Sequence, residues 1–191
     1  RPVARRWRHD HGGPEPAVPS APVPRRRRHR CGSWCAGELS GSGPDCVGDP
    51  LRVGFIGTGD EGSVLIGAHN PDYLQAVAIA DIRPYNVFRA FHGDVSSPNA
   101  QRVRPGLMAK YGWKTEDEAR KQVKVYGAYE ELLADENIEA VVIALPLHLH
   151  AEAAIKAMRA GKHVLTEKLM GHSIHECKEM GRTARETVKL L

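Results

Sequence analysis

The stretch Leu51-Arg-Val-Gly-Phe-Ile-Gly-Thr-Gly-Asp-Glu-Gly62 decides the fold, because a short apolar run leads directly into a glycine-rich turn. The run at 53–56 is typical of a buried strand. Gly57, Gly59 and Gly62 then fall at the G-x-G-x-x-G spacing. In that pattern the first glycine turns the chain, the second lets backbone N–H groups approach a phosphate, and the third lets a helix pack closely. We therefore expect a phosphate-binding turn, with an ordinary tight turn as the alternative.

A second strand and an acidic residue follow at the distance that a nucleotide-binding unit requires. Residues 75–80, of which 76–80 are apolar, are typical of a second buried strand, and Asp81 comes 19 residues after Gly62. A carboxylate there accepts hydrogen bonds from an adenosine ribose, which predicts a dinucleotide site; the alternative is a loop carboxylate that caps a turn. Because Asp81 would repel a 2′-phosphate, NAD is the expected cofactor. Arg83 could pair with that phosphate and keeps NADP open.

The rest of the body alternates between strand and helix patterns. Further strands are predicted at 123–126, 140–145 and 163–166. Helices are predicted at 63–70, 83–92, 115–122, 129–134, 150–160 and 173–189. Residues 93–112 are polar and rich in turn formers. The apolar face of the last helix is expected to comprise Ile174, Cys177, Met180, Ala184 and Val188.

This alternation predicts an α/β fold with a doubly wound parallel sheet, the Rossmann architecture. Ligands bind such sheets beyond the carboxyl ends of the strands. The rule gathers four segments at one edge: Gly57–Gly62, Asp81, Leu145–His150 and Glu167–Lys168.

The composition changes abruptly near Pro50. Residues 1–50 hold nine Arg, no Lys, five acidic residues, eight Pro and seven Gly, whereas residues 51–191 hold 18 basic and 18 acidic residues. The net charge of +4 therefore belongs to the first 50 residues. These have too few aliphatic side chains to offset the entropy of ordering, so a disordered tail is expected before one domain at 51–191.

The run Arg25–Arg28 suggests a nucleic-acid or membrane-surface patch, but no aromatic platform or amphipathic helix accompanies it. We expect this segment to be a solvated leader that binds neither nucleic acid nor a membrane. A twin-arginine export signal stays open, although the apolar segment that should follow is missing. The scattered cysteines favour a reducing, cytoplasmic location. No metal site is expected, either at Cys31, Cys35 and Cys46 or at His172 and His175.

The second half carries the motifs of a known family. Ala144-Leu-Pro-Leu-His-Leu-His-Ala-Glu-Ala-Ala154, followed by Ala160-Gly-Lys-His-Val-Leu-Thr-Glu-Lys168, resembles the signature of the glucose-fructose oxidoreductase / inositol dehydrogenase / MocA family of NAD(P)-dependent oxidoreductases. The resemblance covers about residues 51–189 and implies a nicotinamide site after the fourth strand. With the turn and the acid above, the expected cofactor-binding residues are Gly57, Thr58, Gly59, Gly62, Asp81, Leu145, Pro146, His150 and Glu167. The implied catalytic residue is Lys168.

The resemblance implies hydride transfer between a nicotinamide and a sugar or polyol substrate, while a base handles the hydroxyl proton. Leu147 stands where the family usually has Asn, and Leu169 where it has Pro. Asp60 and Glu61 would repel a pyrophosphate unless their carboxylates point to solvent.

Family members continue into a sheet-rich substrate domain, whereas this sequence stops at Leu191. The expectation is therefore an N-terminal fragment or a truncated gene product without activity of its own. Homo-oligomerisation is left open. The alternative function is a non-catalytic nucleotide-binding or partner-binding module.

Overall fold

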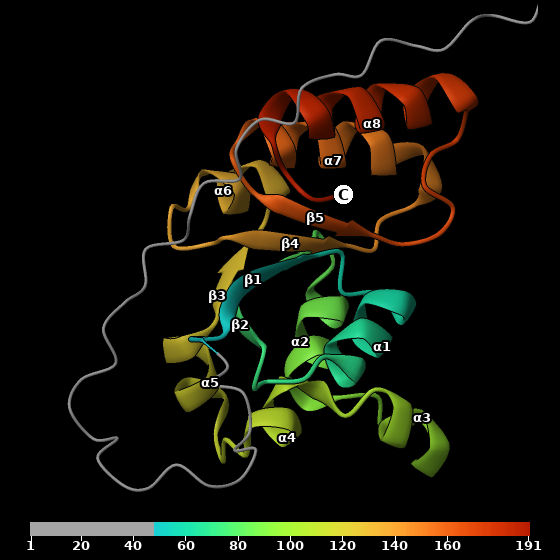
Figure 1. Cartoon of the computed structure of the whole chain (residues 1–191). Helices are drawn as coiled ribbons and strands as arrows, with labels where there is room; N and C mark the ends of the chain where they lie inside the picture. Colours follow the sequence, from blue (N-terminus) through green and yellow to red (C-terminus); the bar gives the residue numbers. More distant parts are fainter. Residues whose placement is uncertain (1–47) are drawn as a thin grey trace, which may run out of the picture. The chain divides into compact units, whose positions relative to one another are not determined.

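The computed structural model describes residues 48–191, so the predictions for the Arg-rich tail lie almost entirely outside the described residues. Five parallel strands form one sheet in the order β3-β2-β1-β4-β5 (Figure 1). They are β1 (Leu51–Ile56), β2 (Leu74–Ala80), β3 (Lys124–Tyr126), β4 (Ala140–Ile143) and β5 (His163–Thr166). The strand order reverses at β1, which pairs with β2 on one side and β4 on the other. The predicted doubly wound parallel sheet is confirmed.

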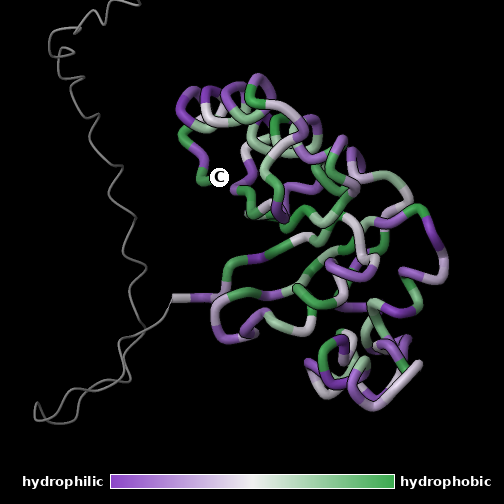
Figure 2. Tube along the Cα trace, turned by 90° about the vertical axis from the view of Figure 1, so that its right-hand side faces the viewer, coloured by the Kyte–Doolittle hydropathy of each residue, from purple (hydrophilic) through white to green (hydrophobic). Residues whose placement is uncertain are grey.

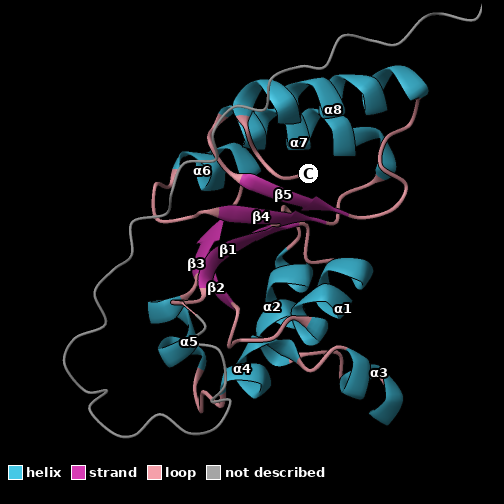
Figure 3. Cartoon of the chain, in the orientation of Figure 1, coloured by secondary structure: helices cyan, strands magenta, loops and turns pink. Residues whose placement is uncertain are grey.

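Helices cover both faces of this sheet (Figure 3). On one side lie α1 (Asp60–Ala68), α2 (Pro84–His92), α3 (Pro98–Val103), α4 (Gly106–Tyr111) and α5 (Glu116–Gln122). On the other lie α6 (Tyr129–Ala134), α7 (His150–Arg159) and α8 (Ile174–Thr187), with the 3-10 turn η1 (Leu147–Leu149) before α7. Within residues 48–191, no helix has both the length and the apolar character needed to cross a bilayer.

Two apolar cores lie on opposite faces of the sheet, because successive strand residues point to opposite sides. In β1, Val53 and Phe55 pack against the α1–α5 layer, whereas Ile56 packs against the α6–α8 layer. Figure 2 shows hydrophobic residues running along the strands. Burial on both faces explains why the central strands β1, β2 and β4 are mostly apolar.

Two predicted element boundaries are wrong at the glycine turn and after the fourth strand. Helix α1 begins at Asp60 and ends at Ala68, not at 63–70, and Gly59 is its N-cap residue. The acidic residues of the first turn favour this early start, because negative charge stabilises a helix N-terminus. Strand β4 ends at Ile143, so the chain leaves the sheet before Leu145.

The segment 93–112 contains two short helices that its polar composition hid. Helix α3 is capped by Ser97, whose Oγ accepts a hydrogen bond from the backbone N–H of Ala100 at 3.1 Å. The predicted apolar face of α8 is also partly wrong, since Ile174 and Val188 are 77% and 79% exposed. Val188 follows the last helical turn with φ of 55°, which carries its side chain off the helix face.

A buried histidine joins the end of α1 to the start of β2. His69 is 7% exposed, and its Nδ1 lies 2.6 Å from the carbonyl oxygen of Ile66. Its Nε2 lies 3.0 Å from the Tyr111 hydroxyl, which also accepts a 2.8 Å hydrogen bond from the N–H of Ala76. Burial lowers the pKa of His69, so the folded protein favours the neutral ring.

Acid is therefore expected to destabilise the protein through His69. The unfolded chain binds a proton at this histidine below about pH 6.5, while the folded chain resists it until the lower folded pKa is reached. Between about pH 8 and about pH 5.5, the free energy of urea unfolding should fall more steeply for the wild type than for His69→Phe. The exposed His175→Phe is the matched control and should keep the wild-type slope; equal slopes for all three proteins would contradict the prediction.

Candidate functional site

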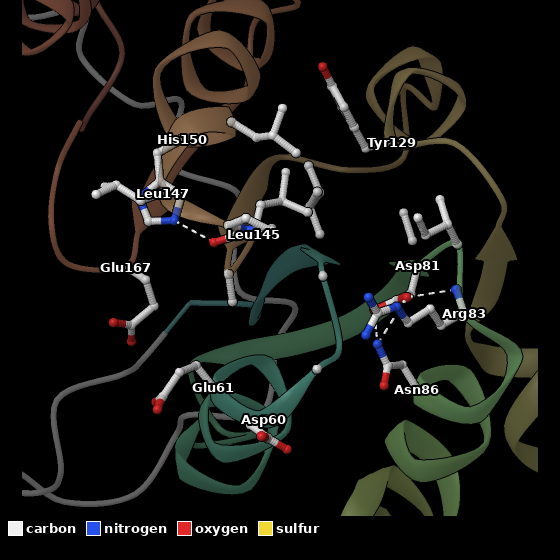
Figure 4. A pocket seen from close by; sticks show the side chains of 18 of the residues that line it. Asp60, Glu61, Asp81, Arg83, Asn86, Tyr129, Leu145, Leu147, His150 and Glu167 are labelled. Atoms are coloured by element: carbon white, nitrogen blue, oxygen red, sulfur yellow. Dashed lines mark hydrogen bonds between the residues drawn. The ribbon is translucent and has the colours of Figure 1, made fainter. Parts of the chain in front are cut away.

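A cavity of about 680 Å³ lies along the carboxyl edge of the sheet (Figure 4). Every strand contributes to it through the residues that follow its last position, as parallel sheets lead one to expect. The lining comes from the glycine turn, the start of α2, the β3–α6 loop, the β4–α7 loop and the residues after β5. Of the predicted site residues, those in the lining are Gly57, Gly59, Asp81, Leu145, Pro146, His150, Glu167 and Lys168.

The three glycines of the turn have three different surroundings. Gly57 has φ of +83°, and a Cβ there would lie 2.5 Å from the carbonyl oxygen of Ala144. A Cβ on Gly62 would overlap the carbonyl oxygen of Gly57, so α1 packs directly onto the turn. A Cβ on Gly59 would meet only the Asn86 amide, at 3.8 Å. The turn therefore needs Gly57 and Gly62 for its own geometry, whereas Gly59 leaves its backbone open to the cavity.

Thr58 lies beneath the turn and supports Asp81. Thr58 is fully buried, and its backbone N–H and Oγ donate to Asp81 Oδ2 at 2.8 and 3.2 Å. Asp81 Oδ1 accepts from the backbone N–H of Arg83 at 2.8 Å. The structure thus places Thr58 and Gly62 behind the cavity wall, and Asp81 on its surface between the turn and α2.

Asp60 and Glu61, the acidic residues of the first helical turn, both line the cavity, and an arginine offsets the charge of Asp60. Asp60 Oδ1 accepts a 2.7 Å hydrogen bond from Arg89, whose side chain is only 9% exposed. Figure 4 shows the Asp60 and Glu61 carboxylates directed away from Asp81. Because Arg89 offsets the charge of Asp60, the first turn of α1 carries less net negative charge than its sequence suggests.

His150 connects the β4–α7 loop to the segment after β5. It is 2% exposed, and its Nε2 and Nδ1 lie 2.7 and 2.8 Å from the carbonyl oxygens of Leu145 and Leu169. Both ring nitrogens therefore contact the protein backbone, and neither is directed at a ligand. His150 holds the position of its neighbours in the cavity, Leu145 and Lys168, rather than offering a free nitrogen.

Glu167 and Lys168 follow β5 and close the far end of the cavity. The backbone N–H of Glu167 donates to the carbonyl oxygen of Ile143 at 2.9 Å, which continues the pairing of β5 with β4. The Glu167 carboxylate accepts from the backbone N–H of Lys168 at 3.0 Å. The Lys168 side chain thus extends from an anchored backbone at the sheet edge.

Several lining residues were missed from the sequence. Asn86 donates to both oxygens of Asp81, and Tyr129 lines the cavity beside the end of β3. The carboxyl-end rule could have found Tyr129, since it follows a predicted strand by three residues. No sequence signal singles out Asn86. Among residues 48–191, no cluster of three or more His, Cys, Asp or Glu side chains could hold a metal ion.

Two known proteins that are similar in sequence to this chain have names that refer to sugars. A glycosyl hydrolase family 109 protein of Shewanella amazonensis is 35% identical over 142 residues, which cover 72% of this chain and 27% of the relative. The 1,5-anhydro-D-fructose reductase of Ensifer adhaerens is 35% identical over 98 residues, 51% of this chain and 27% of that enzyme. The chain therefore spans about a quarter of the length of these relatives.

A solved structure shows the same architecture with a cofactor bound. KijD10, a 3-ketoreductase from Actinomadura kijaniata in complex with NADP and TDP-benzene, is 27% identical with a TM-score of 0.52. The match covers 74% of this chain and 36% of KijD10. Residues 51–191 match the family described as the oxidoreductase family with an NAD-binding Rossmann fold. The chain therefore belongs to the Gfo/Idh/MocA family of oxidoreductases and carries its NAD(P)-binding Rossmann domain.

Proposed function

We propose that residues 51–191 bind NAD(H) along the carboxyl edge of the sheet, as the cofactor domain of an oxidoreductase acting on a sugar or polyol hydroxyl. The observation that carries the proposal is the cavity of about 680 Å³ that joins Asp81, the open backbone of Gly59 and Lys168. It is large enough for an extended ligand, and its two ends differ in chemistry.

The lining fits the parts of a dinucleotide. The turn at 57–59 precedes α1, a helix of nine residues, whose N-terminal N–H groups favour an anion such as the pyrophosphate. Asp81 offers carboxylate oxygens to the ribose hydroxyls at one end. Leu145 and Pro146 offer an apolar surface to the nicotinamide at the other.

The bound nicotinamide would supply the hydride acceptor or donor. In this proposal Lys168 is the group of this chain that exchanges a proton with the substrate hydroxyl, since it lies in the cavity lining after β5. Glu167 and His150 hold the backbone on either side of that lysine through hydrogen bonds at Lys168 and Leu169. They position the lysine and do not contact the reacting atoms.

The substrate class is supported by the names of the relatives. A 1,5-anhydro-D-fructose reductase and a 3-ketoreductase share this domain. Since the chain spans only 27% and 36% of those two proteins, the substrate and the complete reaction are proposed for the whole protein.

Titration of the purified 191-residue chain with NADH, followed by cofactor fluorescence, tests the proposal. Saturable binding is expected, with competition by NAD. No binding would contradict the cofactor site and would favour the alternative of a partner-binding module.

The preference for NAD over NADP is expected to depend on Asp81. Asp81→Asn keeps the shape of the side chain and removes the negative charge that repels a 2′-phosphate. The ratio of the NADPH to the NADH dissociation constant should fall at least about tenfold, which corresponds to about 1.4 kcal/mol. The exposed Asp72→Asn is the control and should leave the ratio unchanged. A wild-type ratio in Asp81→Asn would contradict the role of this carboxylate.

A further inference from the structure

The Asp81 carboxylate is already fully engaged by hydrogen-bond donors of this chain. Oδ2 accepts from Thr58 N–H at 2.8 Å, Thr58 Oγ at 3.2 Å and Asn86 Nδ2 at 3.1 Å. Oδ1 accepts from Arg83 N–H at 2.8 Å and from the same Asn86 Nδ2 at 3.2 Å. A carboxylate has about four lone-pair positions. A ribose hydroxyl that donates to Asp81 must therefore replace one of these donors.

Asn86 is the donor that can leave without disturbing the fold. The N–H groups of Thr58 and Arg83 belong to the backbone, and the Thr58 hydroxyl is attached to a fully buried residue outside the cavity lining. The Asn86 amide is a side chain of α2 that lines the cavity, and its single nitrogen divides its contact between both oxygens at 3.1 and 3.2 Å. Both contacts lie at the long end of the N–H···O range and share one nitrogen, so each is weaker than the 2.8 Å bonds donated by the backbone N–H groups of Thr58 and Arg83.

The position of Asn86 agrees with this exchange. Its Nδ2 faces Gly59 across the cavity, at 3.8 Å from the place where a Cβ would stand. Figure 4 shows the Asn86 amide beside the Asp81 carboxylate, on the side of the glycine turn. An adenosine ribose that joins the Asp81 subsite to a pyrophosphate at Gly59 has to pass this amide.

We propose that Asn86 is a specificity-determining residue whose amide occupies the ribose position on Asp81 and is exchanged for the 2′-hydroxyl when NAD(H) binds. The inference rests on the proposed cofactor site and adds a residue to it. The displaced amide turns toward the cofactor, where its N–H groups can also donate to a 2′-phosphate. Asn86 therefore competes with the hydroxyl of NADH and assists the phosphate of NADPH.

Removing the amide should raise the affinity for NADH and should leave the affinity for NADPH unchanged or lower. In Asn86→Ala the 2′-hydroxyl of NADH meets a free lone pair on Asp81, so its dissociation constant should fall by about three- to tenfold, the range of one hydrogen bond. NADPH has no 2′-hydroxyl to donate and loses a neutral donor, so its affinity should stay the same or fall. The preference for NADH over NADPH should therefore rise by at least about threefold.

The experiment measures both dissociation constants by fluorescence titration for the wild-type chain, Asn86→Ala, Asn86→Leu and the control Asn99→Ala. Asn99 lies on α3, outside the cavity lining, and its variant should keep both wild-type constants. Asn86→Leu keeps a side chain of similar size and should show the same gain in preference as Asn86→Ala. A weaker NADH affinity in both Asn86 variants, or an unchanged preference, would overturn the inference, because Asn86 would then support Asp81 or bind the ribose itself.

An NMR measurement on the wild-type protein tests the exchange independently of the variants. Saturation with NADH should move the side-chain amide signal of Asn86 in a proton–nitrogen correlation spectrum, because its bonds to Asp81 are lost. A signal that stays in place at saturation overturns the exchange. A wild-type chain that binds neither cofactor overturns the proposed function itself, whereas a chain that binds NADH with no gain in the Asn86 variants overturns only this inference.

Discussion

Gly59→Ala is expected to lose at least about 100-fold in NADH affinity while it keeps the wild-type free energy of unfolding. The methyl group would meet only the Asn86 amide of the protein, at 3.8 Å, and Gly59 has φ of −63°, outside the positive range that favours glycine. The methyl group would instead stand in the cavity, between the N-terminus of α1 and the proposed pyrophosphate. Fluorescence titration and urea unfolding of the same sample measure the two effects separately.

Two other glycines serve as controls for this prediction. Gly62→Ala should lose both stability and binding, because its Cβ would overlap the Gly57 carbonyl oxygen and overpacking costs about 1–3 kcal/mol or more. Gly181→Ala, on α8, should lose neither, since the nearest atom to its Cβ would be an Arg185 nitrogen at 3.9 Å. If Gly59→Ala bound NADH as the wild type does, the pyrophosphate could not lie on this turn.

His150→Leu is expected to lower the free energy of unfolding by about 1–3 kcal/mol. Leucine fills a similar volume but has no N–H group, and an imidazole in its neutral form donates one hydrogen bond, so one of the carbonyl oxygens of Leu145 and Leu169, which lie 2.7 and 2.8 Å from the ring nitrogens, would lose its donor. An acceptor left unsatisfied in the folded protein costs about 1–3 kcal/mol. Because the variant also releases the backbone beside Lys168, hydrogen exchange at residues 167–170 should become faster than in the wild type.

His148→Leu is the matched control, since His148 lies two residues earlier in η1 and is exposed. It should change the free energy of unfolding by less than about 0.5 kcal/mol and leave exchange at 167–170 unaltered. Equal stability of the two variants would show that the contacts of His150 with the two carbonyls contribute nothing. Faster exchange over the whole domain, without a local effect at 167–170, would argue against the link between His150 and the lysine.

These predictions share one structural basis, which is the edge where all five strands end. Asp81 and Lys168 are 87 residues apart in the sequence, yet both line one cavity. The order β3-β2-β1-β4-β5 places the glycine turn between them. The loop geometry that a cofactor domain requires therefore follows from parallel strands and right-handed crossovers, not from local contacts between the site residues.

The first turn of helix α1 shows what a local sequence pattern contains and what it does not contain. The helix that spans 60–68 was predicted at 63–70, although the acidic pair Asp60 and Glu61 is itself a local signal for a helix start. The ion pair between Asp60 and Arg89 of α2 could not be predicted in the same way. A residue pair 29 positions apart in sequence leaves no trace in the local pattern.

By itself the sequence determined the architecture and predicted which segments meet at the carboxyl edge of the sheet. The spacing of Gly57, Gly59 and Gly62 and the acid at position 81 indicated a nucleotide site there, because backbone freedom and charge at fixed distances depend on residue type alone. Only the tertiary structure decided what each side chain does there. It assigned Asn86 to the Asp81 carboxylate and both nitrogens of His150 to backbone carbonyls, because hydrogen-bond partners between distant segments are chosen by the packing of helices on the sheet.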